Sequence, residues 1–121
     1  MAPALVAKTL LETSHSWNGA TLHYPSGEAK VVSVFIEVAP GAETGWHVHS
    51  APTLGYVLAG HLEVKLKNGR SKYVGPGDAF AEVVGTLHNG RNVGDEPLRL
   101  IVFHASAAGM PLTTMATEID K

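Results

Sequence analysis

Three histidines in two glycine-framed stretches are the residues of this chain best suited to chemistry. His47 and His49 lie two residues apart within Gly41 to Gly60, and His88 lies within Gly77 to Asn92. Alternate residues of an extended strand point to one face, so the first two imidazoles can converge on a single ion. Imidazole nitrogens suit zinc, copper, iron and nickel. We therefore interpret the three histidines as a metal site, although alternate histidines also occur on exposed strands without any ligand.

Length and composition exclude several classes of function. The 121 residues fit one domain, and the net charge of −2 without a basic run gives no footprint for nucleic acid or an anionic membrane. No apolar stretch approaches the roughly 18 residues that cross a bilayer. The chain has no cysteine, which excludes disulfides and thiolate ligands. Met1 to Lys8 lacks the features of a signal peptide, so we expect a cytoplasmic protein; a periplasmic or secreted one stays open if a leader was removed.

Short β-branched and alternating segments predict an all-β fold. The run Lys30 to Ala39 is typical of a strand buried on both faces. His61 to Lys67 alternates between apolar and polar residues, and Asn68-Gly69 predicts a type I′ hairpin turn after it. Further strands are expected at Ala20 to Tyr24, Thr53 to Leu58, Ser71 to Val74, Ala79 to Val84 and Leu98 to His104.

About eight short strands with frequent turns and little helix favour a single-domain sandwich or barrel. We expect an N-terminal arm over 1–19, a barrel over 20–104, and a tail over 105–121 that packs on or extends from the barrel. The tail contains no clear element. Closure of the sheet would leave an interior that can hold one small ligand.

Two long motifs resemble those of the cupin superfamily, whose members are small jelly-roll β-barrels. Both occur in the family order, and each departs from the family pattern at one position. The first runs Gly41, five residues, His47-Val48-His49, three residues, Thr53, six residues and Gly60, with Thr53 where the family has Glu. The second runs Gly77, five residues, Val83-Val84-Gly85, two residues, His88, three residues and Asn92, with Val83 in place of Pro.

The resemblance implies a cupin-type jelly-roll β-barrel in which His47, His49 and His88 bind a divalent ion: Fe, Mn, Ni or Zn. Three-histidine cupins include ring- and diketone-cleaving dioxygenases, so dioxygenase chemistry on a small anionic or enolisable molecule is the leading expectation. An isomerase or lyase using the metal as a Lewis acid stays open. So do a non-enzymatic binding protein for a small ligand or metal, and a metal-free epimerase-like barrel. The resemblance also implies a homodimer.

Five further residues are candidates for the same site. Glu82 is acidic where the family residue is usually apolar, so it either replaces the missing ligand, acts as a general base, or points outward into solvent. His104 shares strand parity with apolar residues and is expected to enter the barrel, as an acid–base group, a hydrogen-bond partner near the metal, or a core histidine. Thr53, Gly55 and Phe80 are expected to line the pocket.

Overall fold

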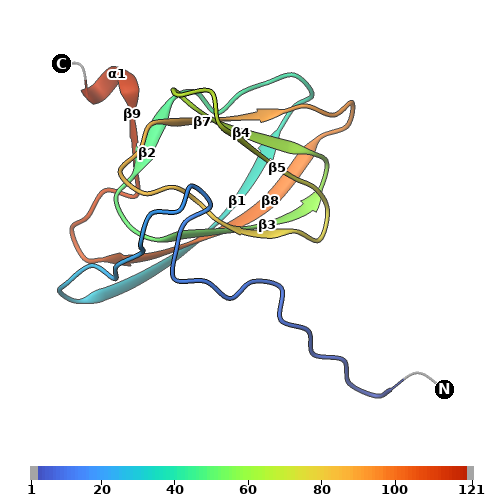
Figure 1. Cartoon of the computed structure of the whole chain (residues 1–121), viewed down its shortest axis with the longest axis horizontal. Helices are drawn as coiled ribbons and strands as arrows, with labels where there is room; N and C mark the ends of the chain where they lie inside the picture. The colour runs from blue at the N-terminus through green and yellow to red at the C-terminus, as the bar shows by residue number, and fades with distance from the viewer. Residues whose placement is uncertain (1–2, 120–121) are drawn as a thin grey trace.

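The computed structural model describes residues 3–119 and consists almost entirely of antiparallel strands (Figure 1). A single four-residue helix lies near the C-terminus of the described chain. The elements are β1 (Ala29–Val38), β2 (His47–His49), β3 (Thr53–Ala59), β4 (Leu62–Leu66), β5 (Ser71–Val74), β6 (Ala79–Ala81), β7 (His88–Asn92), β8 (Leu98–Ala107), β9 (Thr113–Met115) and α1 (Ala116–Ile119). Among residues 3–119, no helix is both long and apolar enough to span a bilayer.

The strands form two sheets that face each other (Figure 1). One has four strands in the order β1-β8-β3-β6, and the other has five in the order β5-β4-β7-β2-β9. This arrangement confirms the predicted all-β jelly-roll class. The two sheets are not joined into a closed barrel by continuous strand pairing, so the expected closure is corrected to a pair of packed sheets.

The core lies between the two sheets because each sheet turns its alternate apolar residues inward. Leu98, Leu100 and Val102 of β8 are buried, as are Leu62 and Val64 of the facing β4. Burying one such side chain stabilises a fold by roughly 1.5–3 kcal/mol. The core therefore fixes the separation of the sheets, and the functional side chains project into the space that remains.

The expectation for the first strand was wrong in one respect. β1 was predicted to be buried on both faces, yet Val31 is 73% exposed and Phe35 58% exposed. β1 is an edge strand, and the outer face of its sheet is not covered by another element of the described chain. The strand predicted at Ala20 to Tyr24 is also absent, because this segment makes only an isolated bridge between His15 and Thr21.

The C-terminal segment and the hairpin turn also differ from expectation. β8 continues to Ala107, and the tail then supplies β9 and α1, where no element was predicted. The β4–β5 hairpin is confirmed, but its turn is not type I′, because Gly69 has positive φ (91°) and Asn68 does not. The amide of Gly69 donates to the carbonyl of Leu66 at 3.1 Å. This is a three-residue loop closed by a glycine bulge.

Candidate metal centre

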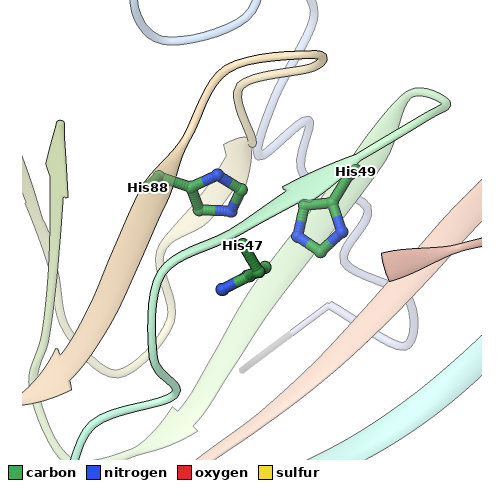
Figure 2. A group of neighbouring side chains, drawn as sticks. All are labelled: His47, His49 and His88. Carbon is green, nitrogen blue, oxygen red and sulfur yellow. The ribbon is translucent and has the colours of Figure 1, made fainter. Parts of the chain in front are cut away.

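Two adjacent strands bring the three histidines together. In the register of β2 and β7, His47 lies directly opposite His88, and His49 follows two residues later on the same face of β2. His47 and His49 are each 8% exposed, and His88 is 1% exposed. One ligand nitrogen from each ring lies within 4.8 Å of the others (Figure 2). Two nitrogens on opposite sides of one ion would be about 4.2 Å apart, so small inward shifts would allow all three to bind.

Backbone carbonyls orient all three rings. A carbonyl oxygen only accepts hydrogen bonds, so each Nδ1 in contact with one carries the proton and each Nε2 keeps its lone pair. The contacts are His47 Nδ1 with Gly45 O (2.6 Å), His49 Nδ1 with Leu112 O (3.2 Å) and His88 Nδ1 with Thr86 O (2.9 Å). Such hydrogen bonds fix the tautomer and direction of metal-binding histidines.

The chemistry of this cluster fits a divalent cation. The Nε2 atom of His88 is buried and, among residues 3–119, is the one buried side-chain polar atom without a hydrogen-bond partner. An unpaired buried polar atom costs about 1–3 kcal/mol unless something binds it. A cation held by Nε2 atoms of His47, His49 and His88 would satisfy this lone pair.

Burial keeps the cluster histidines neutral, as metal ligation requires. Burial, followed by the charges of His88 and His47, lowers the pKa of His49 to about 3. Burial also lowers the pKa of His88 to about 4, against a smaller opposing effect of its hydrogen bond to Thr86. At neutral pH both imidazoles are therefore in the form that binds metal.

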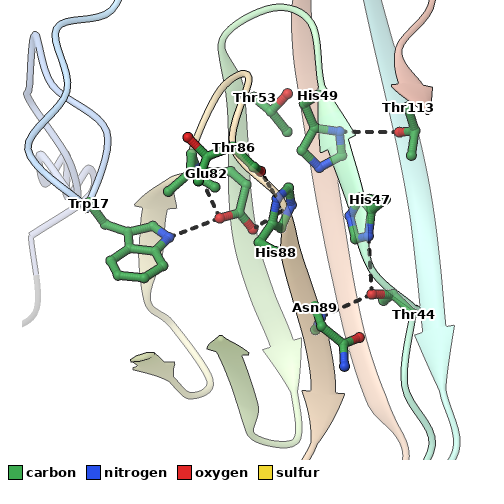
Figure 3. Close-up of polar contacts among 12 residues, drawn as sticks. Trp17, Thr44, His47, His49, Thr53, Glu82, Thr86, His88, Asn89 and Thr113 are labelled. Carbon is green, nitrogen blue, oxygen red and sulfur yellow. Dashed lines mark hydrogen bonds and ion pairs between the residues drawn. The ribbon is translucent and has the colours of Figure 1, made fainter. Parts of the chain in front are cut away.

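Glu82 lies beside this cluster and is 7% exposed, which excludes the solvated outward position (Figure 3). Its Oε1 accepts hydrogen bonds from the indole Nε1 of Trp17 at 2.9 Å and from the amide of Val83 at 3.0 Å. Its Oε2 lies 3.8 Å from Nε2 of His88. Burial raises the pKa of Glu82 to about 7, while the Trp17 and Val83 hydrogen bonds act in the opposite direction.

Thr53 and His104 form a hydrogen-bonded pair across β3 and β8, where they lie directly opposite each other. The Thr53 hydroxyl donates to the carbonyl of Ala51 at 3.0 Å, so its oxygen accepts from Nδ1 of His104 at 2.9 Å. His104 is 5% exposed, as its strand parity predicted, and its ring centroid lies 5.4 Å from that of His49. Nε2 of His104 thus also retains a lone pair.

A cavity of about 260 Å³ joins these groups. The three cluster histidines, Glu82, Thr53, Gly55, Phe80 and His104 all line it, and its remaining walls are mainly aliphatic. The Phe80 ring covers Gly55, where a Cβ atom would lie 2.4 Å from the ring. Among residues 3–119, no lysine or arginine lines the cavity.

The comparison with known families agrees with the motifs. A model of the cupin domain matches residues 34–104, more than half of the chain, including all three histidines of the cluster. The chain belongs to the cupin domain family. It is a cupin with a three-histidine cluster in which Thr53 stands at the position of the motif carboxylate.

Relatives of this cupin include proteins with named activities. The cupin-domain-containing oxidoreductase srdB of Neurospora crassa is 33% identical over 85 residues, which cover 69% of this chain and 41% of that protein. An oxalate oxidase solved with the substrate analogue glycolate has a TM-score of 0.60 and 26% identity, covering 71% of this chain and 46% of its own. This cupin therefore spans less than half the length of both proteins.

A third relative matches over most of its own length. The uncharacterized protein with a double-stranded β-helix domain from Klebsiella pneumoniae has a TM-score of 0.62 and 24% identity, covering 78% of this chain and 90% of its own. At this identity, the likeness supports the fold alone.

Sequence reasoning missed two contributors to the site of this cupin. Trp17 was not among the candidate residues, although its indole donates a hydrogen bond to Glu82, 65 positions away. The carbonyl of Leu112, which orients His49, belongs to a tail in which no element was expected. No local pattern indicates either contact. Glu82, an acidic residue among apolar neighbours, signals only that a buried carboxylate needs a partner and does not identify Trp17.

The stability of the metal-free cupin is expected to fall between pH 7 and pH 5 through His49 and His88. Their folded pKa values lie below the unfolded value of 6.5, so their contribution is present above pH 6.5 and is lost on acidification. At pH 5 the loss is about 2 kcal/mol for each histidine. Glu82 opposes this loss. Its folded pKa is raised from 4.5 to about 7, so its contribution to stability increases as the pH falls from 7 to 5 and is lost as the pH rises.

The measurement is urea unfolding in a chelator at pH 7 and pH 5, for the wild type and for Glu82→Gln. The variant lacks the opposing carboxylate, so its free energy of unfolding should fall more steeply than that of the wild type. Equal stability of the variant at both pH values would contradict the assignment of neutral, buried histidines.

Proposed function

We propose that this cupin is a metal-dependent enzyme of the dioxygenase type, acting on a small, mostly apolar molecule with one chelating group. The observation that carries the proposal is the orientation of three histidines, each with Nδ1 bonded to a carbonyl, on the wall of an aliphatic cavity. When bound, a redox-active divalent metal would supply Lewis acidity and activation of dioxygen. His47, His49 and His88 would hold it.

The lining of the cavity supports an enolisable substrate over a dianion. A small dianion such as oxalate would need cationic partners besides the metal, and the described lining offers none. Glu82 would add repulsion when ionised. The aliphatic walls instead favour apolar substituents, and the metal, when bound, would supply the positive charge that an enolate needs.

His104 is proposed as the group that accepts the substrate proton. Thr53 holds its Nδ1–H, which leaves Nε2 as the available base. In this step the C–H or O–H bond of the substrate breaks, the electron pair stays on the substrate as an enolate, and the proton forms an N–H bond at His104. Phe80 and Gly55 would shape the wall beside the substrate and limit its size.

The presence of His104 also favours a second candidate, an isomerase or lyase that uses the metal only as a Lewis acid. Such an enzyme would move a proton through His104 without consuming oxygen. A non-enzymatic cupin that binds a small ligand or the metal itself would turn over neither class of substrate. The cytoplasmic location stays a prediction.

Elemental analysis of untreated protein, followed by oxygen-uptake assays, tests the proposed function. The panel contains a β-diketone, a catechol and oxalate, with product analysis repeated under anaerobic conditions. Uptake with the diketone or catechol but not with oxalate supports a dioxygenase with an apolar pocket. Anaerobic conversion supports the isomerase or lyase. Stoichiometric metal without any turnover favours the binding protein, and absence of metal contradicts the metal site.

A homodimer is also proposed, and the exposed outer face of the four-stranded sheet supports it. Val31, Phe35, Leu54, Leu58 and Phe103 on β1, β3 and β8 are each 40–73% exposed. Exposed apolar patches of this kind mark protein interfaces. Light scattering should give twice the chain mass of 12.7 kDa. A mass that stays at the monomer value at high concentration would contradict the proposal.

A further inference from the structure

We propose that Glu82 supplies a carboxylate ligand to the metal through Oε2, and that Trp17 is the positioning residue that holds this carboxylate in place. The inference rests on the proposed metal function and deepens it. In the family motif the acidic ligand would stand on β3, where this chain has Thr53, whereas here it would come from the segment after β6. At the β3 position, Thr53 is instead engaged with Ala51 and His104. The ligand set is then His47, His49, His88 and Glu82.

The hydrogen bonds around Glu82 divide its two oxygens into different roles. Oε1 accepts both N–H groups, one from Trp17 and one from Val83. Oε2 takes part in neither bond and points toward His88 (Figure 3). One oxygen thus anchors the carboxylate, while the other is presented to the histidine cluster.

When Glu82 is ionised, the two atoms that face each other at this point are both acceptors. Nε2 of His88 has a lone pair because Nδ1–H is bonded to Thr86, and the ionised Oε2 has no proton to donate. Their separation of 3.8 Å is too long for a hydrogen bond. Two buried lone pairs directed toward each other are unfavourable unless a cation binds both.

The separation also suits two ligands of one ion. Neighbouring ligands about 2.1 Å from a metal lie roughly 3.0–3.4 Å apart in octahedral or tetrahedral geometry. The observed 3.8 Å between Oε2 and Nε2 is about 0.4–0.8 Å wider, and Glu82 lies outside the group of histidine nitrogens that are all within 4.8 Å of one another, so its carboxylate has to turn toward the cluster to bind the same ion.

Trp17 is itself fixed, so it can fix the carboxylate. Its amide donates to the carbonyl of Ala81 at 3.0 Å, adjacent in sequence to Glu82. The preceding Ser16 is 4% exposed, and its amide donates to the carbonyl of Ala20 at 2.9 Å. The loop around Trp17 is therefore docked against the segment that carries Glu82, and the indole N–H has a defined direction.

A carboxylate ligand changes the charge of the site. Three neutral imidazoles leave a divalent ion with a charge of +2, and Glu82 would reduce this to +1. The lower net charge of the site would acidify any bound water less, while the negative carboxylate would attract the ion more strongly than a fourth neutral ligand. The site would then combine histidine and carboxylate ligands, as the two-histidine, one-carboxylate sites of iron(II) oxygenases do, with the carboxylate supplied by the segment after β6.

The test titrates the metal-free full chain with Co²⁺ and records both affinity and the visible absorption of the saturated protein. Glu82→Gln keeps the acceptor for Trp17 but has no charge, and Glu82→Ala has no group that competes for His88. Both should lose affinity by about 10- to 100-fold or more and change the absorption spectrum. Glu63→Gln, at a carboxylate that bonds Tyr73 on β5, is the matched control and should change neither.

Trp17→Phe removes only the indole donor. We expect Co²⁺ affinity to fall by about 10-fold. The melting temperature of the metal-free variant is measured in parallel, because a merely structural role would lower it without a change in the spectrum of the saturated protein. A smaller, broadened shift of that spectrum in the same direction as in Glu82→Ala supports the positioning role.

The possible failures are distinct. If the wild type binds no metal, the proposed function fails together with this inference. If the wild type and Glu82→Ala bind Co²⁺ with equal affinity and identical spectra, the three-histidine site stands and the role of Glu82 as a ligand is overturned. A Trp17→Phe protein with wild-type affinity and spectrum overturns the positioning role alone.

Discussion

His49→Ala is expected to abolish stoichiometric metal binding while leaving a folded β protein. The ring of His49 lies close to both other ligands of the cluster, with centroids 4.9 Å from His47 and 4.8 Å from His88. Its removal leaves two imidazoles and opens the site to water, so we expect affinity to fall by more than about 100-fold, beyond the loss seen for partners of metal ligands. Elemental analysis after dialysis measures the metal, and circular dichroism measures the fold.

His23→Ala is the matched control, because His23 is exposed and lies outside the cluster. It should retain the metal content of the wild type. Should His49→Ala also retain metal at unchanged affinity, the cluster would not be the binding site. Loss of the β spectrum in His49→Ala would point to a folding defect, and His47→Ala would then be measured as an independent removal of a ligand.

The composition of the cluster could be predicted from sequence because it depends on short-range periodicity. His47 and His49 share a face whenever their segment is extended, and the second motif adds His88. His104 was placed inward by the same parity rule. The tautomers could not be predicted, since they depend on the carbonyls of Gly45, Thr86 and Leu112, whose directions follow from loop geometry.

Elements that depend on distant neighbours were predicted less well. β7 has the sequence His-Asn-Gly-Arg-Asn, without a β-branched residue, and it is a strand because it pairs with β4 on one side and β2 on the other. β1 shows the converse. Its β-branched run predicted burial on both faces, but no described element covers the outer face. Strand propensity reflects a fit to a pleated surface and does not state what lies beyond it.

The second large effect is expected at a motif glycine, where Gly60→Ala should destabilise the protein by about 3 kcal/mol or more. Gly60 has φ of 85°, a left-handed conformation that costs an alanine about 1–2 kcal/mol. A Cβ atom there would also lie 2.7 Å from the Cα atom of Leu98 and 2.9 Å from the carbonyl oxygen of Pro97. Both are backbone atoms, so the start of β8 would have to move, which adds roughly 1–3 kcal/mol.

Gly69→Ala separates the two causes. Gly69 has φ of 91°, close to that of Gly60, but a Cβ atom there would meet nothing within 4 Å. It should therefore cost only the conformational part, about 1–2 kcal/mol. Urea unfolding of both variants measures the difference. Equal losses would mean that Gly60 is required for its backbone conformation alone; a larger loss for Gly60→Ala means that the motif glycine also keeps β8, and with it the Leu98 wall of the cavity, in close contact with β3.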